Sequence, residues 1–389
     1  MKLKVDSTGS EVIDAVPENE KAAILNLLRA DEIGSATVRK LLETFGDAQS
    51  CLTADDSTLE NVGRLSRDSI ESLRNAQANN FGEKQLEQAT RLGVRVLCPD
   101  DEEYPTLLKE IYNPPSVLFV LGKPIPTGHN FIAVVGSRNA SEPGIEIAHQ
   151  LGAGLHKADV YSVSGMALGI DGATHRGSLQ EGGKTIAVLG CGVDKVYPSK
   201  HRNLYNEIVQ KGTVISELFL GSAPESKNFP MRNRIIAGMS SGTVVVEAAE
   251  KSGSLITASY ALNENRQVFA VPGHPFSKKH TGCNFLLRQG ATLIRHAGDL
   301  LEDLTPVLDL VKVGKNQGQL PFEPEMELDK EELRVYNELD VMESKHADIL
   351  SEQLKMDTSR LGAILLLLEM KGVVQRLPGD NYRKFAYNG

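Results

Sequence analysis

The chain of 389 residues contains few cysteines and no long apolar run. Its four cysteines are Cys51, Cys98, Cys191 and Cys283, and none belongs to a CxxC pair. This spacing predicts neither a disulfide framework nor a zinc site, and it is typical of a reducing cytoplasm. No segment approaches the roughly 20 apolar residues that cross a bilayer, and residues 1–20 lack the apolar core of a signal peptide. We therefore expect a cytoplasmic protein without a membrane partner.

The charge of the chain is distributed unevenly. The formal net charge is −9, which argues against a surface coated in positive charge for duplex DNA. Between Glu225 and Arg295, however, the sequence has nine Lys and Arg against four Asp and Glu. A local basic surface in an acidic protein is typical of a confined nucleic-acid groove.

The pattern of the sequence predicts four segments. Residues 1–85 read as a small helical module that resembles SAM-like and helix-hairpin-helix domains. Residues 90–305 alternate short β-branched runs with helical stretches, which predicts βαβ units and a mostly parallel sheet with helices on both faces. Residues 306–328 are a polar linker, and residues 329–389 have the outline of a winged helix. The expected strands of the α/β domain are residues 94–97, 117–121, 131–135, 160–164, 185–189, 213–216, 243–246, 267–271 and 292–294.

The roles of the two flanking modules stay open at this point. The Gly-containing turns of the N-terminal module could face a phosphate, but a packing or self-association role is favoured. Winged helices often bind the major groove of DNA, yet residues 323–352 are strongly acidic. We therefore favour a protein-contact or regulatory role for the C-terminal module.

Glycine-rich turns stand where strands of the α/β domain should end. Gly136, Ser137 and Arg138 combine a close backbone approach, a hydroxyl and a planar guanidinium, all suited to a phosphate. Gly165 and Met166 open a second turn, which is neither a dinucleotide fingerprint nor a Walker A loop. Each turn alone is weak, because tight βα turns also need glycine for structural reasons.

The segment from Lys227 to Arg234 is the most informative. Arg232 and Arg234 would lie near a helix N-terminus, where the helix dipole disfavours cations, so an anion between them and the helix end is predicted. Phe229 offers a flat face to a base, and Asn233 can bond to a base edge or sugar. The alternative is a surface ion-pair cluster with Phe229 in the core.

Six further positions complete the predicted site, three as part of the phosphate-binding surface (Ser252, Gly253 and Ser254) and three as supporting residues (Glu247, Asp171 and His175). Ser252, Gly253 and Ser254 open a helix, and Glu247 at a strand end could hold an arginine in place. Asp171 and His175 stand four residues apart on one helix face, and we interpret them as a structural pair rather than catalytic residues. No metal site is expected, because no Cys/His cluster accompanies them.

These motifs, in this order, closely resemble the DNA-processing protein family DprA/Smf. The resemblance covers residues of roughly 94 to 303 and rests on the turns above together with Tyr197-Pro198, Ser216-Glu217, Ile235-Ile236-x-Gly238, Val268 to Gly273 and Gly282-x-Asn284. Thr174 and Asn265 depart from the usual alanine and glycine of the family. The resemblance implies an extended Rossmann-like domain that binds DNA without a nucleotide cofactor.

The resemblance also implies a function. Family members bind and protect incoming single-stranded DNA during natural transformation, help to load the RecA recombinase, also in the presence of single-strand-binding protein, and form homodimers through the Rossmann-like domain. The family's pocket maps here onto Ser137, Arg138, Gly165, Phe229, Arg232, Asn233 and Arg234, with Lys227 nearby. The resemblance therefore predicts a non-catalytic protein.

Two other functions remain as alternatives. Nucleotide-cleaving phosphoribohydrolases share the fold outline, but they carry a Pro-Gly-Gly-x-Gly-Thr loop before a glutamate, which is missing before Glu247. A protein-interaction scaffold with a vestigial DNA pocket is the other alternative.

Overall fold

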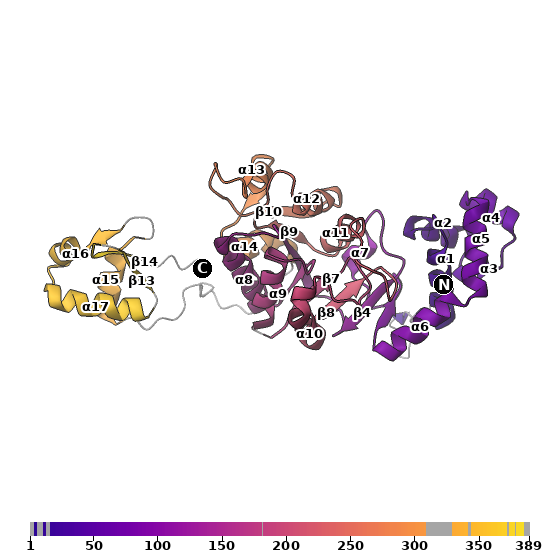
Figure 1. The fold of residues 1–389 in the computed structure, drawn as a ribbon, viewed down its shortest axis with the longest axis horizontal. Coiled ribbons are helices and arrows are strands. Elements are labelled where there is room, and N and C mark those ends of the chain that lie inside the picture. Colours follow the sequence, from indigo (N-terminus) through magenta and orange to yellow (C-terminus); the bar gives the residue numbers. More distant parts are fainter. Residues whose placement is uncertain are drawn as a thin grey trace. The chain divides into compact units, whose positions relative to one another are not determined.

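The computed structural model divides into two compact units, residues 1–313 and 314–389 (Figure 1). It describes residues 4–5, 11–12, 16–180, 182–308, 329–340, 344–371, 373–377 and 379–384. None of the helices in these ranges has the length and apolar character needed to span a membrane. Most of the predicted linker lies outside the described residues, although α14 of the first unit continues to Leu308, past the predicted linker start at 306.

Unit 1 begins with a short strand pair, β1 (Lys4–Val5) and β2 (Glu11–Val12), which the sequence pattern does not predict. A helical module follows, in which Gly46, with φ +89°, ends the second helix. Its helices are α1 (Glu18–Arg29), α2 (Ser35–Phe45), α3 (Ala48–Thr53), α4 (Asp56–Gly63), α5 (Arg67–Ala78) and α6 (Phe81–Leu92).

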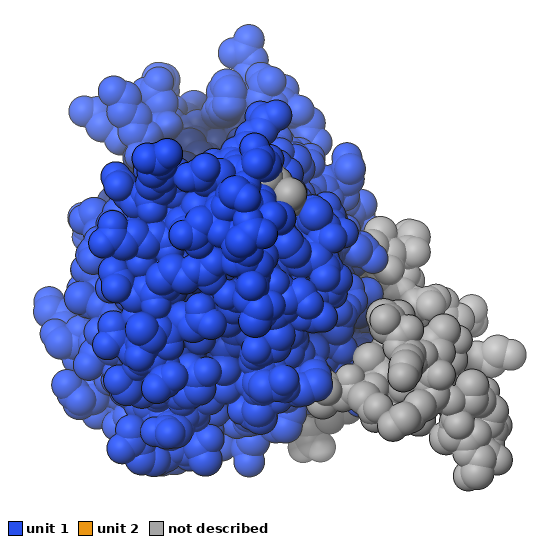
Figure 2. All heavy atoms as spheres, turned by 90° about the vertical axis from the view of Figure 1, so that its right-hand side faces the viewer, with its two compact units in different colours: residues 1–313 blue, residues 314–389 orange. Residues whose placement is uncertain are grey.

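The helical module packs against the sheet domain. Its buried Leu25 and Leu41 belong to the same apolar core as Phe119 and Val214 of the sheet. The turn before α2 also contacts the sheet domain, since Ser35 Oγ accepts a hydrogen bond of 3.1 Å from the Ser116 N–H, which agrees with the favoured packing role. Figure 2 shows unit 1 in space-filling form from the side of the helical module.

A nine-stranded sheet forms the centre of unit 1, in the order β11-β10-β9-β5-β6-β7-β8-β4-β3. Strands β5 to β11 are parallel to one another. At one edge β4 pairs antiparallel with β8, and β3 pairs antiparallel with β4. All nine predicted strands are confirmed, with ends that shift by one residue at most. They are β3 (Arg95–Leu97), β4 (Leu118–Gly122), β5 (Asn130–Val135), β6 (Val160–Ser164), β7 (Thr185–Val188), β8 (Thr213–Ser216), β9 (Gly242–Val245), β10 (Gln267–Ala270) and β11 (Thr292–Leu293).

Helices cover both faces of this sheet (Figure 1). The alternation along β5 separates two cores, because Phe131, Ala133 and Val135 face one side while Ile132 and Val134 face the other. The first face packs against α7 (Thr106–Lys109), α11 (Asn228–Gly238), α12 (Gly253–Asn263) and α13 (Thr281–Arg288). The second packs against α8 (Glu142–Lys157), α9 (Ile170–Gln180) and α14 (Ala297–Leu308), while η1 (Ser199–His201) leads into α10 (Arg202–Lys211) next to β8.

The strand order reverses between β5 and β9. The chain continues from β5 to β6, β7 and β8 on one side, then returns through α11 to β9, β10 and β11 on the other. Ligands of open α/β sheets bind at such a point, in the crevice outside the carboxyl ends of the strands. The predicted α/β, Rossmann-like architecture is therefore present, and it indicates where to look for a site.

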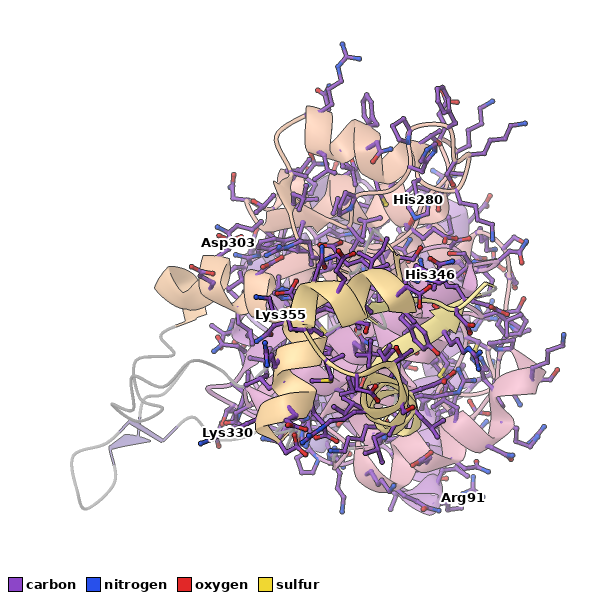
Figure 3. All side chains as sticks on the ribbon, turned by 90° about the vertical axis from the view of Figure 1, so that its left-hand side faces the viewer. Arg91, His280, Asp303, Lys330, His346 and Lys355 are labelled. Carbon is purple, nitrogen blue, oxygen red and sulfur yellow. The ribbon has the colours of Figure 1, made fainter. Side chains whose placement is uncertain are left out.

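Unit 2 has the predicted order of three helices followed by a hairpin. It consists of α15 (Lys330–Glu338), β12 (Lys345–His346), α16 (Ala347–Leu354), α17 (Thr358–Met370), β13 (Val374–Leu377) and β14 (Asn381–Lys384). The three strands form a sheet in the order β12-β14-β13, and Val335, Leu350, Leu361 and Leu365 fill the core. Figure 3 labels Lys330, His346 and Lys355 at the ends of its helices.

Candidate functional site

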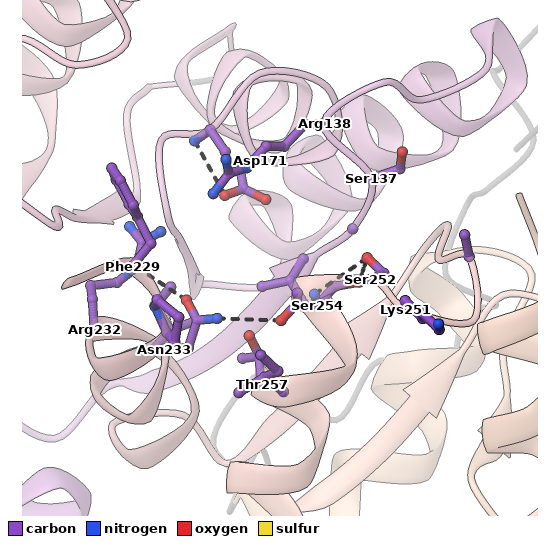
Figure 4. Close-up of a pocket in the computed structure, with 18 of the residues that line it drawn as sticks. Ser137, Arg138, Asp171, Phe229, Arg232, Asn233, Lys251, Ser252, Ser254 and Thr257 are labelled. Carbon is purple, nitrogen blue, oxygen red and sulfur yellow. Dashed lines mark hydrogen bonds between the residues drawn. The ribbon is translucent and has the colours of Figure 1, made fainter. Parts of the chain in front are cut away.

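A pocket of about 640 Å³ opens at the point where the strand order reverses (Figure 4). Its walls come from the turn after β5, the turn before α9, the first half of α11 and the turn that opens α12. Its polar and aromatic lining includes Ser137, Arg138, Asn139, Asp171, Tyr197, Phe229, Arg232, Asn233, Lys251, Ser252, Gly253 and Ser254. Residues up to about 120 positions apart in the chain therefore share one cleft.

The turn after β5 is held from below by the turn after β9. The Ser137 N–H donates to the carbonyl of Glu247 at 2.7 Å. A Cβ atom at Gly136 would lie 2.5 Å from Cγ1 of Ile170, so the close packing here requires glycine. Arg138 then extends into solvent at the pocket, with its guanidinium carbon 5.4 Å from the ring centre of Phe229. This is a cation–π contact.

Arg232 is buried at the base of the pocket, with 5% of its surface exposed. Its Nη1 donates to the carbonyl of Gly165 at 2.7 Å and to the carbonyl of Val188, at the ends of β6 and β7. Its Nε donates to Oδ1 of Asn233 at 3.2 Å. Burial lowers the pKa of Arg232 to about 10, and the nearby Asp171 carboxylate opposes that shift. Within the described residues Arg232 forms no salt bridge, so a buried cation lies at the pocket without an ion-pair partner.

Two aromatic rings line the wall next to Arg138. The rings of Tyr197 and Phe229 have centres 5.3 Å apart and an interplanar angle of 32°. A smaller cavity of about 100 Å³ lies beside them, lined also by Leu189, Gly190 and Arg232. Tyr197 belongs to a motif of the family resemblance, but no local pattern places it in the site, because only the fold brings the loop after β7 to Phe229.

The start of α12 forms the opposite wall. Ser252 caps this helix, accepting from the Ser254 N–H at 3.4 Å, and the two hydroxyls lie 2.7 Å apart. Asn233 Nδ2 contacts the carbonyl of Gly253 at 3.4 Å, which ties α11 to α12 (Figure 4). Lys251, just before the cap, is exposed and also lines the pocket. The positive end of a helix dipole and a nearby lysine together favour an anion.

Comparison with known proteins gives three family matches along this chain. Residues 95–305 match the model described as DNA recombination-mediator protein A, residues 321–380 match a DprA winged-helix domain, and residues 18–63 match a DprA-like N-terminal HHH domain. The first match alone covers more than half of the chain. The chain belongs to the DprA/Smf family.

Individual relatives agree with this assignment. Protein Smf of Synechocystis is 36% identical over 312 residues, covering 78% of this chain and 77% of the relative. DNA processing protein DprA of Streptococcus pneumoniae is 42% identical over 203 residues, covering 52% of this chain and 72% of the relative. The X-ray structure of the S. pneumoniae DprA aligns with a TM-score of 0.63 at 31% identity, covering 74% of this chain and 98% of that one.

Most positions that the DprA/Smf resemblance assigns to the pocket do lie together. The structure gathers Ser137, Arg138, Phe229, Arg232 and Asn233 on one pocket, with Gly165 directly against Arg232. Met166 is buried, with φ +61°, and contributes to the wall of the smaller cavity rather than to the open cleft.

Two predicted cations lie elsewhere. Arg234 points away from the pocket and pairs with Glu217, with Nη2 and Oε2 separated by 2.5 Å. Residues two apart on a helix face opposite sides, so Arg234 cannot share with Arg232 the anion that was predicted between the two arginines and the helix end. Lys227 is exposed, does not line the pocket, and pairs with Glu225 at 2.9 Å.

The predicted supporting residues have other partners than expected. Glu247 is fully buried and accepts from the N–H and Oγ of Ser141, so it holds the start of α8 and not an arginine. Asp171 accepts from the N–H groups of Gly165 and Ala167, and burial raises the pKa of its carboxyl. His175 bonds to Thr185 Oγ1 at 2.7 Å, so the predicted Asp171–His175 pair does not form.

Among the described residues, no cluster of three or more His, Cys, Asp and Glu is arranged to hold a metal ion. The pocket instead combines guanidinium groups, main-chain N–H groups, hydroxyls and aromatic rings. This set can bind phosphates and stack bases.

Proposed function

We propose that the chain binds single-stranded DNA in this pocket and acts as a recombination mediator without catalysis. The observation that carries the proposal is the contrast between paired and unpaired cations. Lys227 and Arg234 are bonded to carboxylates, whereas Arg138, Arg232 and Lys251 line the pocket and form no salt bridge within the described parts of the chain. A cleft lined by such cations focuses its field on a polyanion.

The burial of Arg232 provides an energetic reason for an anion to bind in the pocket. A buried charge costs free energy unless it is paired, and main-chain carbonyls supply only part of the compensation. A phosphate oxygen entering the pocket would supply the counter-charge through charge-assisted hydrogen bonds. Arg138 and the N-terminus of α12 would hold the neighbouring part of the backbone.

The aromatic wall favours an unpaired strand. A base in a duplex is already stacked on both faces and paired at its edge, so it cannot reach Tyr197 or Phe229. In a single strand the bases are free, and stacking of a base on an aromatic side chain is worth about 1–3 kcal/mol. The small cavity next to these rings has room for a nucleotide group that is turned out of the strand.

Four further properties rest on the family resemblance: loading of RecA, action alongside single-strand-binding protein, a role in natural transformation, and a homodimer formed through the Rossmann-like domain. A cytoplasmic location rests on the sequence composition instead. The matched model and relatives are named for recombination mediation and DNA processing, which supports the general role. Phe285 and Leu293 are exposed near the end of the sheet formed by β11, which supports self-association there.

For the winged-helix unit, a protein-contact role stays our prediction. The outward positions of α17 include Gly362, Ala363, Leu366 and Leu367, all exposed. None of these side chains can bond to a base edge. An exposed apolar helix face supports contact with protein.

The enzymatic alternative has less support from the geometry. In a phosphoribohydrolase-like reaction, a carboxylate must reach the substrate, but both Glu247 oxygens accept hydrogen bonds from Ser141. An assay for base release from nucleoside monophosphates separates the two functions. Release that depends on Glu247 would favour the enzyme, and its absence alongside strand binding would favour the proposal.

The central experiment is a titration of one oligonucleotide as single strand and as duplex at two salt concentrations. We expect the single strand to bind more tightly, with affinity that falls as salt rises. Arg138→Ala should weaken single-strand binding. Equal affinity for duplex, or wild-type affinity of that variant, would remove the pocket from the function, and absence of binding would favour the scaffold alternative.

A further inference from the structure

We propose that the loop of residues 272–280, between β10 and α13, is a second single-strand subsite, with Phe276 as a stacking platform for bases that continue beyond the pocket. The inference rests on the proposed function and extends it. It assigns a binding role to a loop that the pocket does not include.

The position of the loop supports this role. It follows β10, which pairs in parallel with β9, so it leaves the sheet at the carboxyl ends of the strands, where the pocket also lies. Nζ of Lys279 donates to the carbonyl of Asn139 at 3.0 Å, and Asn139 lines the pocket. The loop is therefore attached directly to the pocket rim.

The ring of Phe276 is 90% exposed, the most exposed of the large apolar side chains in the described residues. The loop nevertheless has defined internal bonds. The side chain of Asn284 bonds to both the N–H and the carbonyl of Gly273, and Ser277 Oγ lies 3.0 Å from Nδ1 of His280 (Figure 3 labels His280). The Phe276 N–H donates to Nδ1 of His274, and the two rings have centres 5.6 Å apart.

Exposing a phenylalanine on an ordered loop has a free-energy cost, since the ring's apolar area could otherwise be buried. A ligand that covers the ring recovers that free energy. The flat ring suits any of the four bases, because every base has a π face.

The charge around Phe276 favours a polyanion as this ligand. Residues 272–280 include Lys278 and Lys279 and no Asp or Glu. In the described residues neither lysine forms a salt bridge, and Lys251, across the pocket rim, is likewise unpaired. Alternation of lysines with an aromatic ring is the arrangement that tracks a strand by its phosphates and its bases.

A second copy of the chain is the competing ligand for the ring. A two-fold contact centred on Phe276 would bring Lys278 and Lys279 of one copy against the same lysines of the other. Like charges in such a contact repel, which disfavours this arrangement. In the titration of Phe276→Trp, an indole signal that follows protein concentration would indicate such a contact.

The chain contains no tryptophan, which allows a direct test. Phe276→Trp introduces a single indole into the loop, and the matched control is Tyr112→Trp. Tyr112 is 83% exposed, and its N–H donates to Glu264. Glu264 follows the C-terminus of α12, at the end of the sheet opposite to the pocket. Each variant is titrated with an oligothymidylate of about 4 nucleotides and one of about 20, the short one sized for the pocket alone.

We expect the long strand, but not the short one, to quench the indole at 276, and neither to quench the indole at 112. Phe276→Ala should lower affinity for the long strand by about five-fold or more and leave the short strand unchanged. Equal long-strand affinity of Phe276→Ala and wild type would overturn the subsite. So would an indole signal that follows protein concentration instead of DNA, which would assign the ring to self-association.

The design separates this inference from the proposed function. If the wild-type chain bound neither strand, or if Arg138→Ala left binding of the short strand intact, the pocket itself would fail. If those tests succeed and only the Phe276 variants behave as wild type, the loop alone is excluded.

Discussion

The guanidinium of Arg232 occupies the space where a side chain on Gly165 would stand. A Cβ atom on Gly165 would lie 2.5 Å from Nη2 of Arg232 and 2.7 Å from its Cζ. Gly165 has an ordinary backbone conformation, so the reason for glycine is this close approach and not a positive φ. The turn after β6 and the arginine of α11 are therefore built as one unit.

This contact predicts that Gly165→Ala disables Arg232 without removing it. The added methyl group must displace the guanidinium from the carbonyls of Gly165 and Val188. We expect single-strand affinity to fall by about 10- to 100-fold, the range for losing a hydrogen bond to a charged group, and to match Arg232→Ala. Binding titrations measure this, with thermal unfolding as a check that the variants fold.

Gly34→Ala is the matched control outside the pocket. A Cβ atom there meets no atom within 4 Å and Gly34 does not line the pocket, so this variant should bind like wild type. If Gly165→Ala also bound like wild type, the guanidinium position would not matter for binding.

The contrast between Arg138 and Lys227 predicts a difference in salt dependence. Arg138 lines the pocket without a carboxylate partner, whereas Lys227 is bonded to Glu225 outside it. Arg138→Ala should lower the slope of log affinity against log salt by about 0.7, the value for one phosphate contact to a single strand. Lys227→Ala should leave the slope nearly unchanged. A larger loss of slope in Lys227→Ala would place the strand outside the pocket.

These comparisons also show how far sequence reasoning reaches. All nine strands and the winged-helix elements were predictable, because alternating apolar residues, glycine turns and caps are local signals. The carboxyl-end turns were predictable as a site for the same reason. Which side chain enters the site depends on the helix face, and a strict 100° count along α11 would have separated Arg232 from Arg234.

The partners of the buried polar residues were not predictable from local pattern. Glu247 meets Ser141 across 106 residues, and His175 meets Thr185 on the neighbouring strand. Tyr197 reaches Phe229 only through the path of the loop after β7. Such contacts are set by strand order and loop course, for which a single sequence carries no period.

Glu247 predicts a stability effect rather than a binding effect. Glu247→Ala leaves the half-buried N–H and hydroxyl of Ser141 without their acceptor, which should cost about 1–3 kcal/mol of unfolding free energy. Urea denaturation of the full chain measures this. The neighbouring exposed Glu250→Ala serves as the control and should change stability by no more than about 0.5 kcal/mol. Unchanged stability of Glu247→Ala would mean that water or another group satisfies Ser141.

His175 predicts a loss of stability in acid. Burial lowers the pKa of His175 from its ordinary value of 6.5 to about 3, and its ring is bonded through Nδ1 to Thr185. Below pH 6.5, His175 therefore binds a proton in the unfolded chain, whereas in the folded chain it stays neutral until the pH is near 3. Stability must fall as pH drops through this window, by about 1.4 kcal/mol per unit, or about 2 kcal/mol between pH 8 and pH 5.

His175→Gln removes the titrating group, so its denaturation midpoint should depend less on pH over that range. The remaining dependence should come in part from His201, whose pKa burial also lowers. If the variant kept the full pH dependence of the wild type, the proton that destabilises the fold would enter elsewhere.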